Sequence, residues 1–306
     1  MITFKQFLLE EDDVISSKRK TLLHLQNMKP IEFIEWIKGL HDDFGGVLSD
    51  LEVTLKVDGL GARFGKDKND RFFFEGSRTG PIFEPKSFSK HAKEKGSKEE
   101  IVARAGHYDD MFDTLQSSKL MKAIPNDTKV VCEVFYNPMG VEQGNNITFV
   151  SVKYDKSKLG SLMTIVPISV LVASSGTEHK DAHNILEKLY AASDSKIKVV
   201  NPKLETGKID IRAHTRPILK FGEQEIATLK SLKATDKPAK QALLTAIQKA
   251  KEELAEYLLH HPSIKGKEKL GKDIEGLVLK AGNQPVKVTT QEFKDSKRKE
   301  REARSE

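Results

Sequence analysis

The spacing of apolar residues changes several times along the chain, and each change predicts a different kind of element. Residues 30–40 carry apolar side chains three and four positions apart, with Pro30 in the first turn, and this pattern predicts a helix. In residues 51–57 the spacing becomes two, which predicts a strand that ends at a glycine turn. The sequence therefore predicts a helix at 30–40 followed by a strand at 51–57.

The same two patterns alternate through the rest of the chain. Further helices are expected at 86–123, 179–192 and 222–261, and Pro238 should separate two helices in the last of these. Further strands are expected at 71–75, 129–136, 147–154, 164–173, 273–280 and 285–290. This mixture predicts an α+β fold of antiparallel sheets with helical insertions.

Composition narrows the class of protein. The 306 residues include one cysteine, Cys132, so an internal disulfide is excluded. The longest apolar run, residues 164–173, is far shorter than the roughly 20 residues of a membrane span, and no basic start followed by an apolar run suggests secretion. We therefore expect a cytoplasmic protein without a membrane partner. A net charge of +6 permits nucleic-acid binding, but a solvated basic surface explains it equally well.

Four short motifs follow one another in a fixed order. They are KVDG at 56–59, SRTG at 77–80, EGLVLK at 275–280 and PVKV at 285–288, with Glu133 in the strand between the second and third. A lysine at a strand end followed by glycine can project into a cleft from a rigid support. A nucleophilic lysine must also lose its proton, although its ordinary pKa is about 10.4, so neighbouring cations and desolvation are needed.

This ordered set resembles the covalent nucleotidyltransferase superfamily of ATP-dependent DNA ligases, RNA ligases and mRNA capping guanylyltransferases. The resemblance spans roughly residues 50–290 and implies the nucleotidyltransferase (ATP-grasp-like) fold. It also implies ATP and Mg²⁺ (or Mn²⁺) as cofactors. The expected activity is an ATP-dependent polynucleotide ligase that joins 5′-phosphate and 3′-hydroxyl ends through a lysyl-AMP intermediate. Its partner would be nucleic acid, either nicked duplex or RNA ends.

The resemblance assigns roles residue by residue. Lys56 corresponds to the nucleophile and Lys287 to the lysine on the α-phosphate. Arg78 corresponds to the arginine on the ribose and the polynucleotide end. Glu133 corresponds to a carboxylate that binds ribose, and Glu275 to one linked to metal; these two form the expected metal ligands. The remaining expected nucleotide contacts are Asp58, Gly59, Arg63 and Lys280.

Structural alternatives stay open for several of these residues. Asp58 can cap a turn, and Glu133 can pair with a structural lysine. Lys280 and Lys287 can be exposed strand charges, and Arg63 can form a surface ion pair. Cys132 is expected to be a small core residue.

Three departures from the family pattern shape the prediction. DNA ligases usually carry arginine five residues after the lysine, whereas this chain has Gly61 there and Arg63 beyond it. The second lysine of the usual K-x-K motif is Thr289. The residues after Lys287 are too few for a C-terminal OB-fold, so another protein is a possible source of a clamp. The first and third departures favour an RNA-ligase-like enzyme over a DNA ligase.

The remaining expectations concern organisation and alternative functions. We expect an N-terminal helical segment over 1–45, an adenylyltransferase domain over 46–293 with a helical insertion at about 222–262, and a charged tail over 294–306, in a monomer. Residues 1–10 resemble cleaved leaders of packaged phage proteins, although a docking helix is the more ordinary interpretation. Alternative functions are a DNA ligase, a GTP-dependent capping-type guanylyltransferase and a non-catalytic nucleic-acid-binding virion protein.

Overall fold

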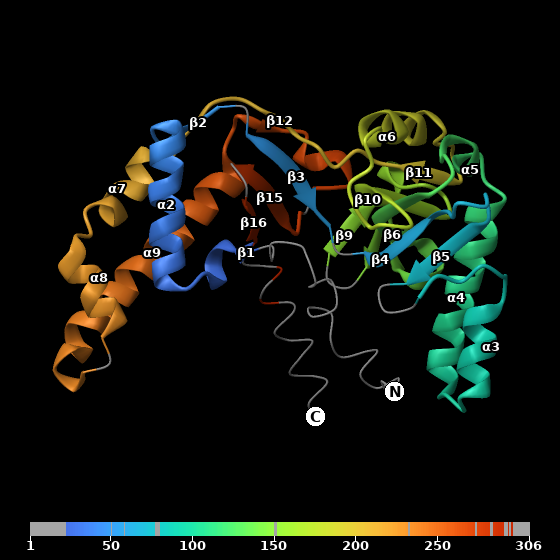
Figure 1. The fold of residues 1–306 in the computed structure, drawn as a ribbon, viewed down its shortest axis with the longest axis horizontal. Helices are drawn as coiled ribbons and strands as arrows, with labels where there is room; N and C mark the ends of the chain where they lie inside the picture. The colour runs from blue at the N-terminus through green and yellow to red at the C-terminus, as the bar shows by residue number, and fades with distance from the viewer. Residues whose placement is uncertain are drawn as a thin grey trace. The chain divides into compact units, whose positions relative to one another are not determined.

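In the computed structural model, the chain forms two compact units (Figure 1). It describes residues 23–49, 51–57, 59–76, 80–149, 152–231, 233–272, 274–281, 284–290, 293 and 295. The first unit contains the described parts of Val57–Pro202 and Lys269–Asp273. The second contains the described parts of Lys18–Lys56, Lys203–Glu268 and Ile274–Glu306.

The first unit is built on a five-stranded sheet in the order β11-β10-β6-β4-β5. Its strands are β4 (Leu60–Lys66), β5 (Phe72–Gly76), β6 (Thr128–Tyr136), β10 (Met163–Val172) and β11 (Ile197–Val199). All neighbours are antiparallel except β10 and β11. A separate three-stranded sheet contains β7 (Val141–Gln143), β8 (Asn146–Phe149) and β9 (Val152–Asp155).

Helices cover one face of this five-stranded sheet. They are α3 (Ser87–Glu94), α4 (Glu99–Gln116), α5 (Leu120–Ala123) and α6 (Ala182–Ala191). Phe64 and Phe74 from the sheet and Phe112 from α4 are fully buried in the core between the layers. Residues of opposite parity, such as Arg63, Glu75 and Glu133, lie on the other face. That face carries the charged candidates of this unit.

The second unit is built on a four-stranded sheet in the order β1-β16-β15-β3. Its strands are β1 (Leu23–His24), β3 (Glu52–Lys56), β15 (Gly276–Ala281) and β16 (Gln284–Thr289). The helices of this unit are α2 (Pro30–Phe44), α7 (Arg212–Leu219), α8 (Glu223–Lys230) and α9 (Lys237–His260) (Figure 1). Short strand pairs join β2 (Val47–Leu48) to β13 (Ile209–Asp210) and β12 (Glu205–Thr206) to β14 (Ile264–Lys265).

The α+β class predicted from the sequence is confirmed, and so are most of its elements. The helix expected at 30–40 is α2, and Pro238 lies in the first turn of α9, after α8. One expected strand is wrong in detail, because 147–154 forms the two antiparallel strands β8 and β9. Strand β4 was not expected, since Gly59 and Gly61 interrupt the alternation. Residues 1–22 and most of the tail lie outside the described residues.

Among the described residues, no helix combines the length and the apolar composition that crossing a membrane requires.

Candidate active site

Strand register brings the lysines of three motifs onto one face of the second unit's sheet. On β15, Gly276 lies opposite Lys56 of β3 and Thr289 of β16, while Val278 lies opposite Lys287. Directly opposed residues of antiparallel strands point to the same side of the sheet. Lys56, Lys280 and Lys287 therefore share one face, which we call the lysine face.

The opposite face of the same sheet is apolar and buried. Val53 and Leu55 of β3, Leu277 and Leu279 of β15, and Val286 and Val288 of β16 are each at most 5% exposed. This alternation is the reason the lysines project away from the core: a shift of register by one residue would bury them. The alternation of apolar and polar residues thus determines the side of the sheet to which the Lys56 side chain points.

Lys56 is held by the carboxylate of Glu275. The two side chains form an ion pair, and Glu275 is only 1% exposed. Among the described residues, neither Glu275 side-chain oxygen accepts a hydrogen bond in addition to this pair. The Lys56 ammonium also lies 5.0 Å from the centre of the Phe293 ring. The lysine is therefore oriented by a buried charge on one side and by an aromatic ring on another.

Gly276 lies on the lysine face, on the strand between those that carry Lys56 and Lys287. A Cβ atom at this position would lie 2.1 Å from the carbonyl oxygen of Val288, so no other residue fits without displacing the backbone. The glycine of EGLVLK thus has a specific packing reason.

The other two lysines of the face differ in their surroundings. Lys287 is half-buried on β16, whereas Lys280 is exposed and lies 3.6 Å from the carboxylate of Glu52. The pairing of Lys280 agrees with the alternative of an exposed strand charge. Lys287 lies two strands across and two residues along from Lys56, so their backbone positions are about 12 Å apart at ordinary strand spacing, which is within reach of two groups of one nucleotide.

The first unit holds a second group of predicted residues. Glu133 of β6 lies opposite Gly61 of β4 and is half-buried. Arg63, two residues along β4, has its guanidinium 3.6 Å from the carboxylate of Glu75. Glu75 is buried and also accepts an ion pair from Lys129 at 3.1 Å. Arg63 is thus part of a half-buried charge cluster rather than an isolated surface pair.

Gly59 approaches the backbone of β6 closely. A Cβ atom there would lie 2.8 Å from the carbonyl oxygen of Val134, next to Glu133. Glycine is therefore required where the chain passes from Lys56 into β4. Asp58 and Arg78, the two other predicted contacts, lie outside the described residues.

Cys132 is a core residue, as expected. It is 1% exposed, and its thiol donates to the carbonyl oxygen of Ala62 at 3.5 Å. Burial raises the pKa of the Cys132 thiol, and the charge of Glu133 raises it further. The thiol therefore stays protonated and is no nucleophile.

Within the part of the chain that the structure describes, no group of three His, Cys, Asp or Glu side chains could hold a metal ion alone. Mg²⁺ usually binds one or two carboxylates together with waters and substrate phosphates. The buried carboxylate of Glu275, whose only described partner is a lysine, fits the role of one such ligand. Glu133, the other predicted ligand, belongs to the first unit.

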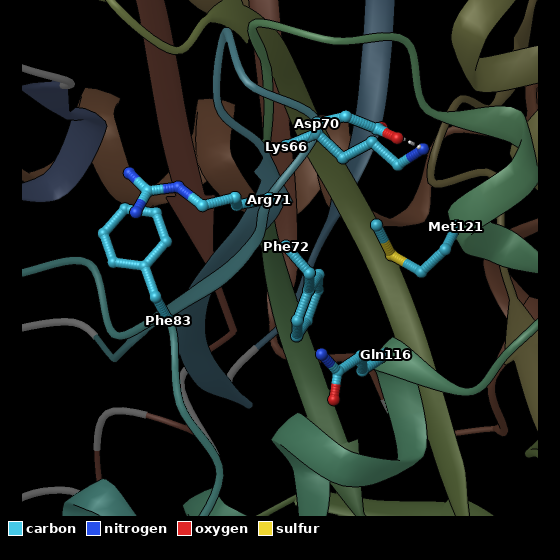
Figure 2. Close-up of a pocket in the computed structure, with 7 residues that line it drawn as sticks. All are labelled: Lys66, Asp70, Arg71, Phe72, Phe83, Gln116 and Met121. Atoms are coloured by element: carbon cyan, nitrogen blue, oxygen red, sulfur yellow. Dashed lines mark ion pairs between the residues drawn. The ribbon is translucent and has the colours of Figure 1, made fainter.

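A pocket of the first unit lies outside the predicted residues. Figure 2 shows its lining, which includes Lys66, Arg71, Phe72, Phe83 and Met121. The Arg71 guanidinium lies 4.6 Å from the centre of the Phe83 ring, and Lys66 pairs with Asp70 at 2.8 Å. The cations of this pocket thus have acidic or aromatic neighbours already, and the motif residues do not line it.

Sequence reasoning missed one residue of the lysine face, His24. It lies in register with Lys287 through the parallel pairing of β1 and β16. A two-residue strand has no periodic signal, and its partner is 263 residues away in the sequence. Only the fold could reveal this neighbour.

No protein-family model and no curated protein sequence matches the chain. Solved structures that match include an RNA ligase of Naegleria gruberi. A variant of that ligase with AMP and Mn has 13% sequence identity and a TM-score of 0.41, covering 91% of this chain and 57% of that chain.

A second variant of the same ligase, with ATP and Mn, has 12% identity and a TM-score of 0.40 at the same coverage. This chain therefore matches 57% of the length of these structures. At these values the likeness does not assign a function to this chain.

Proposed function

We propose that this protein is an ATP-dependent polynucleotide ligase that acts through a Lys56–AMP intermediate. The observation that carries the proposal is the Lys56–Glu275 ion pair on the lysine face, with Gly276 beside it and Lys287 on the same side. These residues come from motifs more than 200 positions apart in the sequence. Their meeting in one sheet is what a site assembled from the ordered motif set requires.

The first chemical step is the attack of the Lys56 amine on the α-phosphorus of ATP. The Nζ–P bond forms, the bond from the α-phosphorus to the bridging oxygen breaks, and pyrophosphate leaves with that oxygen. Nζ must lose one proton so that its lone pair can attack. A neighbouring carboxylate favours the charged ammonium, so the ion pair holds Lys56 oriented but unreactive at rest.

Glu275 is the group in contact with Nζ and is thus the nearest described acceptor for this proton. Lys287 would lie against the non-bridging phosphate oxygens, where its charge stabilises the negative charge that develops during transfer. A bound Mg²⁺ (or Mn²⁺) would add positive charge at the same phosphates, with Glu275 as a protein ligand. Glu133, Gly59, Arg63, Asp58 and Arg78 are proposed contacts to the nucleoside and the polynucleotide end.

After adenylylation, the AMP would pass from Lys56 to a 5′-phosphate, and a 3′-hydroxyl would then displace the AMP to join the ends. We favour RNA over DNA because Gly61 occupies the position at which DNA ligases carry arginine. Sealing of nicks with a ribose or a deoxyribose 3′-hydroxyl terminus compares the two directly. Equal sealing of both would contradict the RNA preference and leave the ligase proposal intact.

The decisive experiment is covalent labelling with ATP labelled in the α-phosphate, in the presence of Mg²⁺. The wild-type chain should acquire an acid-labile label that Lys56→Ala and Lys56→Arg abolish. Lys66→Ala is a matched control, since Lys66 also ends a strand and precedes an acidic turn. It should leave labelling unchanged.

Two outcomes would redirect the proposal. Labelling by GTP in preference to ATP would indicate a capping-type guanylyltransferase. Absence of label with either nucleotide, in a folded protein that still binds nucleic acid, would indicate a non-catalytic binding protein.

A further inference from the structure

The lysine face continues onto a fourth strand that lies outside the motif set. Strand β1 pairs in parallel with β16, with Leu23 in register with Val286 and His24 in register with Lys287. Neighbouring strands lie about 4.8 Å apart, so the backbone positions of His24 and Lys287 are direct neighbours. The pairing adds an imidazole to the row that already contains Thr54, Val278 and Lys287.

Burial shows to which side His24 points. Val286, the residue before Lys287 on β16, is fully buried, and Leu23, the residue before His24, is in register with it. Successive side chains of a strand point to opposite faces, so His24 and Lys287 both point away from this apolar layer. His24 is half-buried, as Lys287 is. Both side chains therefore belong to the lysine face.

Two further contacts fix the segment that carries His24. The Gln26 side-chain amide donates to the carbonyl oxygen of Thr289 at 2.9 Å, which ties η1 (Leu25–Asn27) to the end of β16. The ammonium of Lys251, a residue only 4% exposed on α9, donates to the carbonyl oxygen of Met28. Burial lowers the pKa of Lys251. Contacts on both sides of the turn hold the position of His24 relative to Lys287.

We propose that His24 and Lys287 together form a binding site for a phosphate group, which in the proposed function is a phosphate of ATP. Strand β16 supplies a single cation to this face, because the position two residues after Lys287 is the uncharged, buried Thr289. An imidazole can donate hydrogen bonds to phosphate oxygens, and when protonated it adds a second positive charge. His24 is thus a nucleotide-binding residue that the motifs do not contain.

Direct binding tests the site without any need for catalysis. Inorganic pyrophosphate and, separately, ATP without metal are added to the wild-type chain at fixed pH while the histidine imidazole signals are followed by NMR. The His24 signal should shift on addition of either ligand, and the shift should disappear in Lys287→Ala. His183, exposed on α6 of the first unit, serves as the internal reference and should not shift.

Labelling of Lys56 gives a second readout. His24→Gln should raise the ATP concentration for half-maximal labelling by roughly tenfold, the effect of losing one charge-assisted hydrogen bond, while the label still forms. His24→Lys should restore most of the loss, and His183→Gln should have no effect. An unchanged ATP dependence in His24→Gln would overturn the proposal, as would an unshifted His24 signal in the wild-type chain.

The two proposals fail differently, although this one rests on the proposed function for the identity of its ligand. If the wild-type chain takes no label from ATP but pyrophosphate still shifts His24, the ligase proposal fails and the phosphate site stands. If Lys56 is labelled and the His24 signal shifts with neither ligand, the phosphate site fails and the ligase proposal stands. The NMR measurement on the wild-type chain decides the case even where His24→Gln does not fold.

Discussion

Glu275 is the residue whose charge most directly controls Lys56. Glu275→Gln preserves the size of the side chain but removes the negative charge that orients the ammonium and can take its proton. We expect the rate of Lys56 labelling under single-turnover conditions to fall by about 10²-fold or more, the usual contribution of a positioned acid or base. Glu52→Gln, which removes the exposed partner of Lys280, is the matched control and should retain most of the rate. A near wild-type rate in Glu275→Gln would exclude a role for its charge.

Two glycines of the second unit should respond in opposite ways to alanine. Gly276→Ala places a Cβ atom 2.1 Å from the Val288 carbonyl oxygen, and the backbone must shift to admit it. We expect a decrease of about 1–3 kcal/mol in the free energy of unfolding, as in overpacked cores. Gly39, inside α2, has no neighbouring atom within 4 Å of the place that a Cβ atom would take, and Gly39→Ala should stabilise by about 0.5–1 kcal/mol. Urea denaturation of both variants measures the difference.

At the scale of elements, the junction of β13 and α7 carries a pH-dependent contact. The Asp210 carboxylate accepts hydrogen bonds from the Arg212 side chain at 2.9 and 2.6 Å and from its backbone N–H at 3.0 Å. These bonds lower the pKa of Asp210 from 3.8 to about 2. The folded pKa is the lower one, so the stabilisation is present above pH 3.8 and disappears as the pH falls through about 2.

Arg212→Met should therefore raise the pKa of Asp210 towards 3.8, which an NMR titration of the carboxyl carbon measures directly. The pair is exposed, so added salt should reduce the difference between variant and wild type. Arg216→Met on the same helix is the control and should leave the titration unchanged. An Asp210 titration that Arg212→Met does not move would show that backbone donation alone sets the pKa.

Elements with a continuous period could be predicted from the sequence, and interrupted or very short elements could not. Strand β6 is an almost uninterrupted run of Val and other apolar residues and is predictable. Strand β4 contains Gly61 and Gly65, and a Cβ atom at Gly65 would lie 1.9 Å from the carbonyl oxygen of Thr128 in β6. Helix α7 contains Pro217, a residue that is disfavoured in helix interiors, so its sequence does not predict a helix. The same limit applies to the site. Lys56 and Glu275 stand in recognisable motifs, while His24 enters through a parallel pairing with a strand at the other end of the chain.

For the whole molecule, a net charge of +6 does not tell where a nucleic acid would bind. Two basic segments are candidates for such a surface, and both lie on helices. On α3, Lys90 and Lys93 with the preceding Lys86 follow one another at spacings of four and three, which puts them on one side. Phe88 and Ala92 are buried on the other. The alternative is the helical segment of the second unit, which carries exposed lysines on α8 and α9.

Salt dependence of binding distinguishes these two surfaces. For a single strand, the slope of log K against log salt is negative, and each lost contact between a lysine and a phosphate reduces its magnitude by about 0.7. Replacing Lys86, Lys90 and Lys93 by Gln should therefore reduce the magnitude by about 2 if α3 binds the nucleic-acid backbone. Replacement of Lys230, Lys237 and Lys249 by Gln removes the same charge from the second unit and should leave the slope close to wild type. The reverse result would move the binding surface to α8 and α9. Equal small effects of the two sets of replacements would mean that binding depends on net charge and not on a defined row of lysines.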